Sequence, residues 1–231
     1  MTASRLAAVA ASLLLALGSA VGPSANPSRL TPRRTGPAAA ADARGGGLGL
    51  GITADGAGFT LDGTPTFLKG ISYFGYGSGP DGPGLKLDLD AMQKCGINWL
   101  RLWVTWNEWS MLTREGAIVP AQATRLTAVL AELQRRGLAA DLTLNRESNS
   151  GKAMKCGAQM CGGLADQASH LRGVRALANL TLPFRSVYFD LANEHDVQDS
   201  RFVNHSEIRA LRDVVKFVDP MRLVTASSRS V

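Results

Sequence analysis

Beyond its first twenty residues, the sequence lacks any apolar run long enough to cross a membrane. A spanning helix needs roughly 18 or more consecutive apolar residues, and no later stretch approaches that length. We therefore expect no stable membrane insertion once the leader described below is removed.

An excess of charge is also lacking in the main part of the chain. Five of the 25 Lys and Arg and one of the 19 Asp and Glu lie in residues 1–47, which leaves 20 against 18. This near-neutral balance gives no support to nucleic-acid binding.

Cysteine is scarce, with three residues in the whole sequence. Cys156 and Cys161 lie in one Gly-rich segment and could close a small disulfide ring in an exported protein, which would leave Cys95 unpaired. The segment holds no histidine, and His170 comes nine residues later within a helical pattern. We therefore expect no metal site, and no feature of the sequence indicates a cofactor.

The chain begins with the features of a secretory signal. A basic start at residues 1–5 precedes an apolar run of 12 residues, Leu6–Leu17, and small residues follow at 16–20. Residues 21–47 are rich in Pro, Ala, Gly and Arg and show no periodicity, which is typical of a flexible linker. We expect a signal peptide at 1–20, a linker at 21–57, one domain at 58–231, and a secreted or periplasmic location.

Strands and helices alternate along this domain. Asp62 and Gly63 form the predicted turn of a hairpin over residues 59–68. Repeated strand–helix units predict an α/β fold with parallel strands, and both a doubly wound sheet and a (β/α)8 barrel of the TIM type fit the order. The predicted strands are 69–74, 97–104, 139–144, 187–191 and 222–226, and the predicted helices are 87–95, 120–136, 166–180 and 206–218.

Polar residues at alternate positions of the strands favour the barrel. In a doubly wound sheet helices cover both faces, so both sets of alternate positions should be apolar. Here Asp141 alternates with leucines, Arg101 lies between two leucines, and Asp190 shares its parity with Glu194. Buried ionisable groups need partners, so we expect Arg101, Asp141 and Asp190 to pair inside a barrel. The alternative places them at strand ends in water.

Asn193 and Glu194 directly follow the fourth predicted strand of the barrel. That position is the C-terminal rim, where the loops between strands and helices build active sites. A carboxyl group partly desolvated by aromatic side chains has a raised pKa and can donate a proton near neutral pH, while a neighbouring amide can bind a sugar hydroxyl. We therefore predict Glu194 as a general acid/base. The alternatives are a solvated loop carboxylate and a helix-capping partner.

Three segments, FLKGISYF, GINWLRLWVTW and VYFDLANEHD, resemble the cellulase-like glycoside hydrolases of the retaining (β/α)8-barrel clan. The resemblance runs from about Phe59 to Ser228. It implies Glu194 as the acid/base, Asn193 as the partner of the sugar 2-hydroxyl, and Arg101 as the residue that orients the active-site carboxylates. His195 stands where many relatives have proline, which changes the loop after the acid/base.

The resemblance implies hydrolysis of O-glycosidic bonds in an oligo- or polysaccharide. A retaining mechanism needs a second carboxylate about 5–5.5 Å from the first, and in this clan the nucleophile is a Glu that ends strand seven. A full barrel takes about 250 residues. We therefore expect this chain to be the front part of a barrel, about five strands long, without the nucleophile. An exported carbohydrate-binding relative and an inactive remnant are the alternative functions.

Aromatic residues lie at or beyond the ends of the first two strands, where sugar rings could pack on them. We interpret Phe74 as core filling and Trp106 and Trp109 as a sugar platform, and we leave Trp103 open between the two. His170 is interpreted as a structural or surface helix residue, and Glu108, Glu115 and Glu147 as solvated loop charges. The predicted substrate-binding residues are Asn193, Arg101, Tyr73, Trp103, Trp106 and His195.

Overall fold

The computed structural model describes residues 49–74, 83–106, 109–145, 154–156, 158–197 and 201–229. The predicted signal peptide and most of the predicted linker lie outside these residues, as do Glu108 and Glu147. Among the described helices, none has both the length and the apolar character that a membrane span requires.

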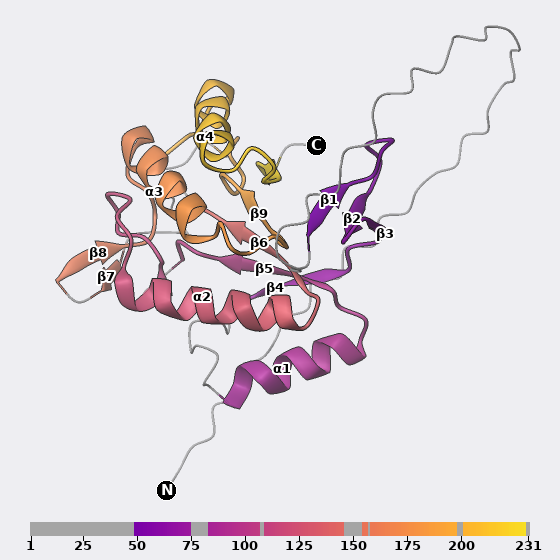
Figure 1. Ribbon diagram of the computed structural model, residues 1–231. Helices are drawn as coiled ribbons and strands as arrows, with labels where there is room; N and C mark the ends of the chain where they lie inside the picture. Colours follow the sequence, from indigo (N-terminus) through magenta and orange to yellow (C-terminus); the bar gives the residue numbers. More distant parts are fainter. Residues whose placement is uncertain are drawn as a thin grey trace, which may run out of the picture. The chain divides into compact units, whose positions relative to one another are not determined.

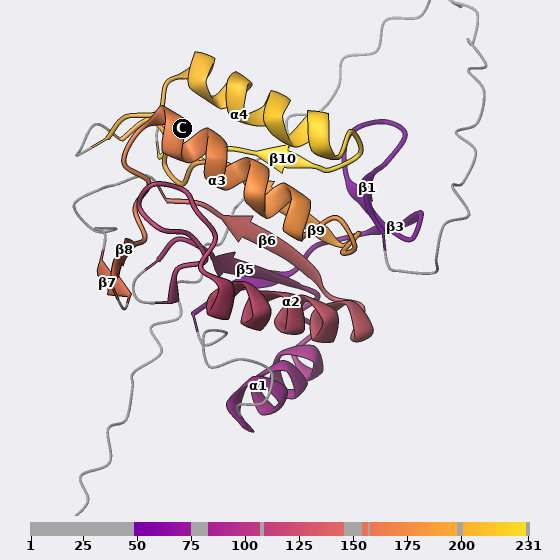
Figure 2. The same ribbon diagram turned by 60° about the vertical axis from the view of Figure 1, so that its left-hand side comes forward.

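Five parallel strands form the central sheet, in the order β10-β9-β6-β5-β4 (Figures 1 and 2). Strands that are consecutive in the sequence among these five are therefore also neighbours in the sheet. A doubly wound sheet reverses its order at a switch point, whereas the strands of a barrel follow one another. The topology thus agrees with the predicted barrel. The strands are β4 (Gly70–Tyr73), β5 (Trp99–Trp103), β6 (Ala139–Thr143), β9 (Val187–Asp190) and β10 (Val224–Thr225).

Four helices connect these strands, and in both views they follow one another in chain order along the sheet (Figures 1 and 2). All four were predicted from the sequence, the last three from an apolar face. The first begins four residues earlier than predicted, at Pro83, because proline is tolerated in a first turn, where its missing N–H would have no helical partner. The helices are α1 (Pro83–Lys94), α2 (Pro120–Arg135), α3 (Gln167–Leu180) and α4 (His205–Val218).

The register of the strands separates an apolar face from a polar one. Leu102 of β5 aligns with Leu142 of β6 and Phe189 of β9, and all three are buried in the core with the apolar stripes of the helices. One residue away, Arg101 aligns with Asp141. Because side chains alternate along a strand, the polar residues share the face opposite to the helix-packed core. This confirms the predicted alternation.

A small antiparallel sheet, β1-β2-β3, precedes the barrel strands. The hairpin turn at Asp62 and Gly63 was predicted, and both residues have positive φ, 50° and 75°, as a two-residue hairpin turn of this type requires. The placement of the linker end at residue 57 was wrong, because β1 lies within 21–57 and pairs with β2. The strands are β1 (Leu50–Ile52), β2 (Phe59–Leu61) and β3 (Thr64–Thr66).

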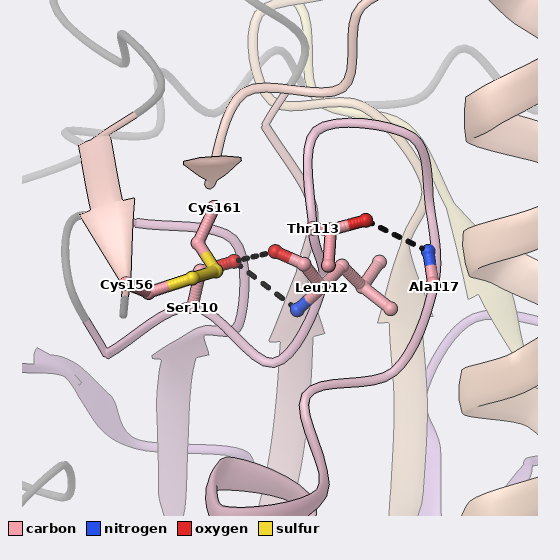
Figure 3. The surroundings of a disulfide bond; sticks show 6 residues. All are labelled: Ser110, Leu112, Thr113, Ala117, Cys156 and Cys161. Carbon is pink, nitrogen blue, oxygen red and sulfur yellow. Dashed lines mark hydrogen bonds between the residues drawn. A yellow bond between two sulfur atoms is a disulfide. The ribbon is translucent and has the colours of Figure 1, made fainter. Parts of the chain in front are cut away.

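A disulfide joins Cys156 to Cys161 and closes the hairpin of β7 (Met154–Cys156) and β8 (Gln159–Cys161) (Figure 3). Cys95 is free and exposed. The ring was foreseen as possible; the hairpin was not predicted. Cys161 forms a β-bridge with Thr113 of the loop between β5 and α2. In that loop the Ser110 hydroxyl accepts from the Leu112 N–H at 3.2 Å (Figure 3). The disulfide hairpin is therefore attached to the neighbouring rim loop.

Candidate active site

Arg101 is the centre of a polar cluster on the inner face of the sheet. Its Nε donates to Thr143 Oγ1 at 2.7 Å and lies 3.5 Å from Asp141 Oδ2, both on β6. Its Nη2 donates to Asp190 Oδ2 on β9 and, at 3.2 Å, to Asn193 Oδ1 beyond the end of β9. The predicted pairing of Arg101 with Asp141 and Asp190 is thus confirmed. One guanidinium joins three neighbouring strands.

The cluster contains two carboxylates, Asp141 and Asp190, but one cation, Arg101, and this imbalance contributes to a raised pKa of Asp141. Burial, together with the charge of Asp190, raises the pKa of Asp141 to about 7, although Arg101 opposes the change. Its Oδ1 is buried and has no hydrogen-bond partner. A charged carboxylate in such a place is costly, so protonation relieves both the repulsion and the desolvation. Asp141 is therefore partly protonated at neutral pH.

The turn after β9 presents Glu194 to solvent in an uncommon backbone conformation. Its φ is +46°, in the left-handed region, and its side chain is exposed. A residue with a Cβ pays roughly 1–2 kcal/mol to adopt this conformation, so surrounding contacts must hold it. The Asn193 N–H donates to the Leu144 carbonyl at 2.9 Å, and the Glu194 N–H donates to Ser227 Oγ at 3.0 Å. The turn is thus attached to the ends of both neighbouring strands.

Ser227 belongs to the cluster, although it was not predicted from the sequence. Its hydroxyl accepts from Arg101 at 3.4 Å and from the Glu194 N–H, and it donates to Asn193 Oδ1 at 3.4 Å. Its own N–H donates to Asp190 Oδ1 at 3.0 Å. Its position just past the last predicted strand was the available signal, because strand ends meet at the same rim.

An aromatic group lies beside Arg101. The Phe74 and Trp103 rings are stacked with centroids 5.7 Å apart, and Trp106 meets Trp103 edge-on at 5.2 Å. The Arg101 guanidinium lies 4.7 Å from the Trp103 ring centre. The interpretation of Phe74 as core filling was wrong: it follows the end of β4 and is 56% exposed. Trp109 contacts Arg125 of α2 instead, at 5.3 Å.

Tyr73 is separated from this group, so its assignment to the substrate site is corrected. It aligns with Leu102 on the core face, is 8% exposed, and donates its hydroxyl hydrogen to Asp88 of α1 at 2.8 Å. The alternation of side chains along β4 decides this, because residues 72 and 74 take the opposite face. Tyr73 therefore fixes α1 to the sheet.

His195 lies next to the acid/base candidate in sequence but points into the protein. Its ring is buried, with Nδ1 3.1 Å from the Val203 carbonyl and the His205 ring 5.2 Å away. Its N–H donates to the Ser227 carbonyl at 2.9 Å. The structure therefore favours a role in holding the turn over the predicted contact with substrate.

Within the described ranges, no three His, Cys, Asp or Glu side chains come together as metal ligands would.

Of the predicted substrate-binding residues, the structure brings Arg101 and Asn193 together with the aromatic residues Trp103 and Trp106. Among the described residues, Arg101 contacts the amide of Asn193 rather than the carboxylate of Glu194. The arrangement offers an exposed carboxyl group, an amide fixed by an arginine, and aromatic faces at one rim.

No protein-family model and no curated protein matches the sequence. Solved structures do share the fold. The glycoside hydrolase family 5 mannosidase from Rhizomucor miehei superposes with a TM-score of 0.58 at 18% identity, over 79% of this chain and 56% of that one. The fold is a (β/α)8 barrel, in part. The exo-β-1,4-mannosidase from Opitutaceae bacterium strain TAV5 gives a TM-score of 0.56 at 20% identity, over 78% of this chain and 34% of that one. The chain thus spans about half the length of the Rhizomucor miehei mannosidase.

Proposed function

We propose that the chain belongs to a glycoside hydrolase that cleaves O-glycosidic bonds of an oligo- or polysaccharide, with Glu194 as the general acid/base. The observation that carries this proposal is the turn after β9. There Glu194 is held exposed in a left-handed conformation, next to an asparagine that Arg101 fixes. Strained backbone that is held by several contacts is concentrated at functional sites, which supports a role for this carboxyl group.

The surroundings of the turn suit a sugar. The C–H faces of a pyranose pack on aromatic rings such as Trp103 and Trp106, while its hydroxyls need polar partners such as the Asn193 amide. A variant of the Rhizomucor miehei mannosidase was solved in complex with mannosyl-fructose, at 20% identity to this chain and a TM-score of 0.57. That similarity supports an oligosaccharide as the substrate, and the similar fold of the exo-β-1,4-mannosidase supports a β-linked one.

In the proposed mechanism the configuration at the anomeric carbon is retained. Glu194 first gives its proton to the leaving glycosidic oxygen, while a second carboxylate attacks the anomeric carbon. Glu194 then takes a proton from the water that hydrolyses the glycosyl intermediate. Asn193 binds the sugar 2-hydroxyl, and Arg101 holds the Asn193 oxygen so that the amide N–H₂ points to the ligand. We place the nucleophile outside the described residues. We also propose that the segment 1–20 is a signal peptide that directs the protein to export.

The test is the Glu194→Gln variant of the full-length protein, assayed on aryl β-mannosides and aryl β-glucosides. Loss of the proton donor should lower kcat/KM on poorly activated substrates by about 100- to 10,000-fold. A dinitrophenyl glycoside, whose leaving group needs no proton, should still form the intermediate, and azide should restore turnover. Glu115→Gln is the control, because Glu115 is an exposed glutamate on another rim loop. Activity unchanged in Glu194→Gln would refute the assignment.

A non-catalytic carbohydrate-binding protein is the second candidate, and the aromatic group favours it. It predicts glycan binding that persists in Glu194→Gln and is lost in Trp106→Ala, with no hydrolysis by the wild-type protein. Calorimetric titration of both variants with manno- and cello-oligosaccharides separates the two functions. Hydrolysis that depends on Glu194 supports the enzyme, and binding alone supports the second candidate.

A further inference from the structure

A buried polar network lies behind the turn, on the helix side of β9. His170 of α3 is fully buried, and its Nε2 lies 2.7 Å from the carbonyl oxygen of Leu191, the residue after β9. Its Nδ1 lies 3.2 Å from an Arg201 nitrogen, and Arg201 also donates to the Glu207 carboxylate at the start of α4. The network thus connects two helices to the segment that leads into Asn193 and Glu194.

The partners determine how the imidazole carries its hydrogen. The Nδ1 lies 3.2 Å from an Arg201 nitrogen and 3.6 Å from the Glu207 carboxylate. Because the arginine is the nearer partner and only donates, we assign this Nδ1 as an acceptor without a hydrogen. A carbonyl only accepts, so the Nε2 that faces Leu191 must carry the hydrogen. The ring is therefore neutral, in the Nε2–H form. Burial lowers the pKa of His170, in spite of the Glu207 carboxylate 3.6 Å away, and this agrees with the neutral ring.

The Leu191 carbonyl is a point where the turn can be controlled. The Leu191 N–H is still part of the sheet and donates to the Thr225 carbonyl at 2.8 Å. Two residues later, the Asn193 N–H donates to the Leu144 carbonyl on the other side. Between these two contacts the chain leaves the strand, and the orientation of the Leu191–Ala192 peptide sets the direction in which Asn193 and Glu194 project. His170 contacts that peptide.

We propose that His170 is a positioning residue: its Nε2–H, held in place by Arg201 and Glu207, fixes the Leu191 peptide and thereby the placement of Glu194. This inference rests on the proposed function of Glu194 for its effect on catalysis, but not for its effect on the turn. No contact with substrate is required, because the imidazole acts through the backbone.

The test compares His170→Gln with His170→Asn in the full-length protein. The Gln amide nitrogen reaches about as far as Nε2 and can donate to Leu191, whereas the shorter Asn cannot reach that carbonyl. Val174→Ala, a fully buried residue of the same helix that contacts the core, controls for a general loss of packing. Thermal unfolding of all three variants measures the global effect.

Two readouts do not depend on activity. The ¹⁵N shifts of the His170 ring should show a protonated Nε2 and a bare Nδ1. Amide hydrogen exchange at residues 192–195 should be faster in His170→Asn than in His170→Gln and in Val174→Ala. A ring protonated at Nδ1, or equal exchange in His170→Asn and His170→Gln, overturns the inference.

The catalytic readout separates positioning from simple destabilisation. In His170→Asn, kcat should fall by at least about 10-fold with KM nearly unchanged, since a displacement of about 1 Å at a catalytic group can cost about 100-fold. His170→Gln should recover most of the loss, and Val174→Ala should keep the wild-type kcat. Equal kcat in the Asn and Gln variants contradicts the proposal. If the wild-type protein hydrolyses no glycoside, the proposed function fails, while the exchange and ¹⁵N results still decide the role of His170.

Discussion

At the scale of single residues, the candidate site is governed by the balance of charge around Arg101. Two carboxylates, Asp141 and Asp190, share this one guanidinium. A buried pair of like charges cannot both ionise cheaply, so one of them keeps its proton to higher pH. Asp141, with an unpartnered oxygen, is the one whose pKa is raised.

Asp141→Asn should therefore change how stability depends on pH. Because the pKa of Asp141 is raised to about 7 from its ordinary value of 3.8, the folded state binds the proton more tightly than the unfolded state. Its stabilising contribution is present below pH 4 and is lost as pH rises to about 7, at up to about 1.4 kcal/mol per pH unit. The asparagine variant should not show this loss.

Urea unfolding at pH 4, 5.5, 7 and 8 checks this. The free energy of unfolding of Asp141→Asn relative to wild type should rise from pH 4 to pH 7 and stay level above that. Asp213→Asn, an exposed aspartate on α4, is the control and should show little change. A difference between wild type and Asp141→Asn that is constant over the whole range would contradict the raised pKa.

At the scale of elements, α3 joins the rim loops to the sheet. The loop between β5 and α2 approaches this helix so closely that a Cβ on Gly116 would lie 2.0 Å from the Ser169 carbonyl oxygen. Gly116 also has a φ of +83°, which other residues rarely adopt. The start of α3 is thus fixed between this loop and its own cap, and His170 lies one residue after Ser169.

Asp166 is that cap. Its Oδ1 accepts from the Ser169 N–H at 2.7 Å and from the Ser169 hydroxyl at 2.6 Å. Asp166→Ala should lower the free energy of unfolding by about 1 kcal/mol, since an N-cap residue satisfies a backbone donor that has no helical partner. Asp166→Asn keeps an acceptor and should retain most of the stability. Denaturant unfolding of the two variants checks this; equal losses would show that the cap bond is not responsible.

At the scale of the whole molecule, the polar cluster is what connects the strands on the side away from the helices. Arg101 contacts residues of β6 and β9 and the segment after β10, so three connections depend on one side chain. On the other face, leucines and other apolar residues of the strands pack with the helices. The two faces therefore contribute in different ways: the apolar core provides most of the stability, and the cluster sets the geometry of the rim.

Arg101→Ala should consequently be costly in stability as well as in any activity. It leaves Asp141 and Asp190 buried without a cation, and breaking a buried pair on one side costs about 3–5 kcal/mol. Urea unfolding at pH 7 measures the loss. Arg135→Ala is the matched control: its ion pair with Glu132 is on the surface, with the arginine 66% exposed, so solvent screens it and its loss should change the free energy of unfolding little. Similar losses in both variants would refute the special role of Arg101.

The sequence by itself determined the order of the elements and the parity of the strands. Apolar periodicity predicted three of the four helices, and the alternation at 101, 141 and 190 predicted the polar inner face, because both patterns are local consequences of chain geometry. The Asn193–Glu194 motif and Arg101 were also identifiable, since their chemistry stands out from apolar neighbours. The short strands β1, β7 and β8 were missed, because they carry little pattern, whereas the equally short β2 and β3 were predicted with the help of their turn at Asp62 and Gly63.

Beyond the pairing of Arg101 with the two aspartates, only the tertiary structure decided which residues meet. Tyr73 and Phe74 are neighbours in sequence, yet one packs against α1 and the other joins the aromatic group at the rim, since a strand sends successive side chains to opposite faces. The hydroxyl of Ser227 contacts the backbone of Glu194, 33 positions away in the sequence. The ring of His170 contacts the carbonyl of Leu191, 21 positions away. No local pattern encodes such partners, because they are set by how the strand ends and helices come together in the folded chain.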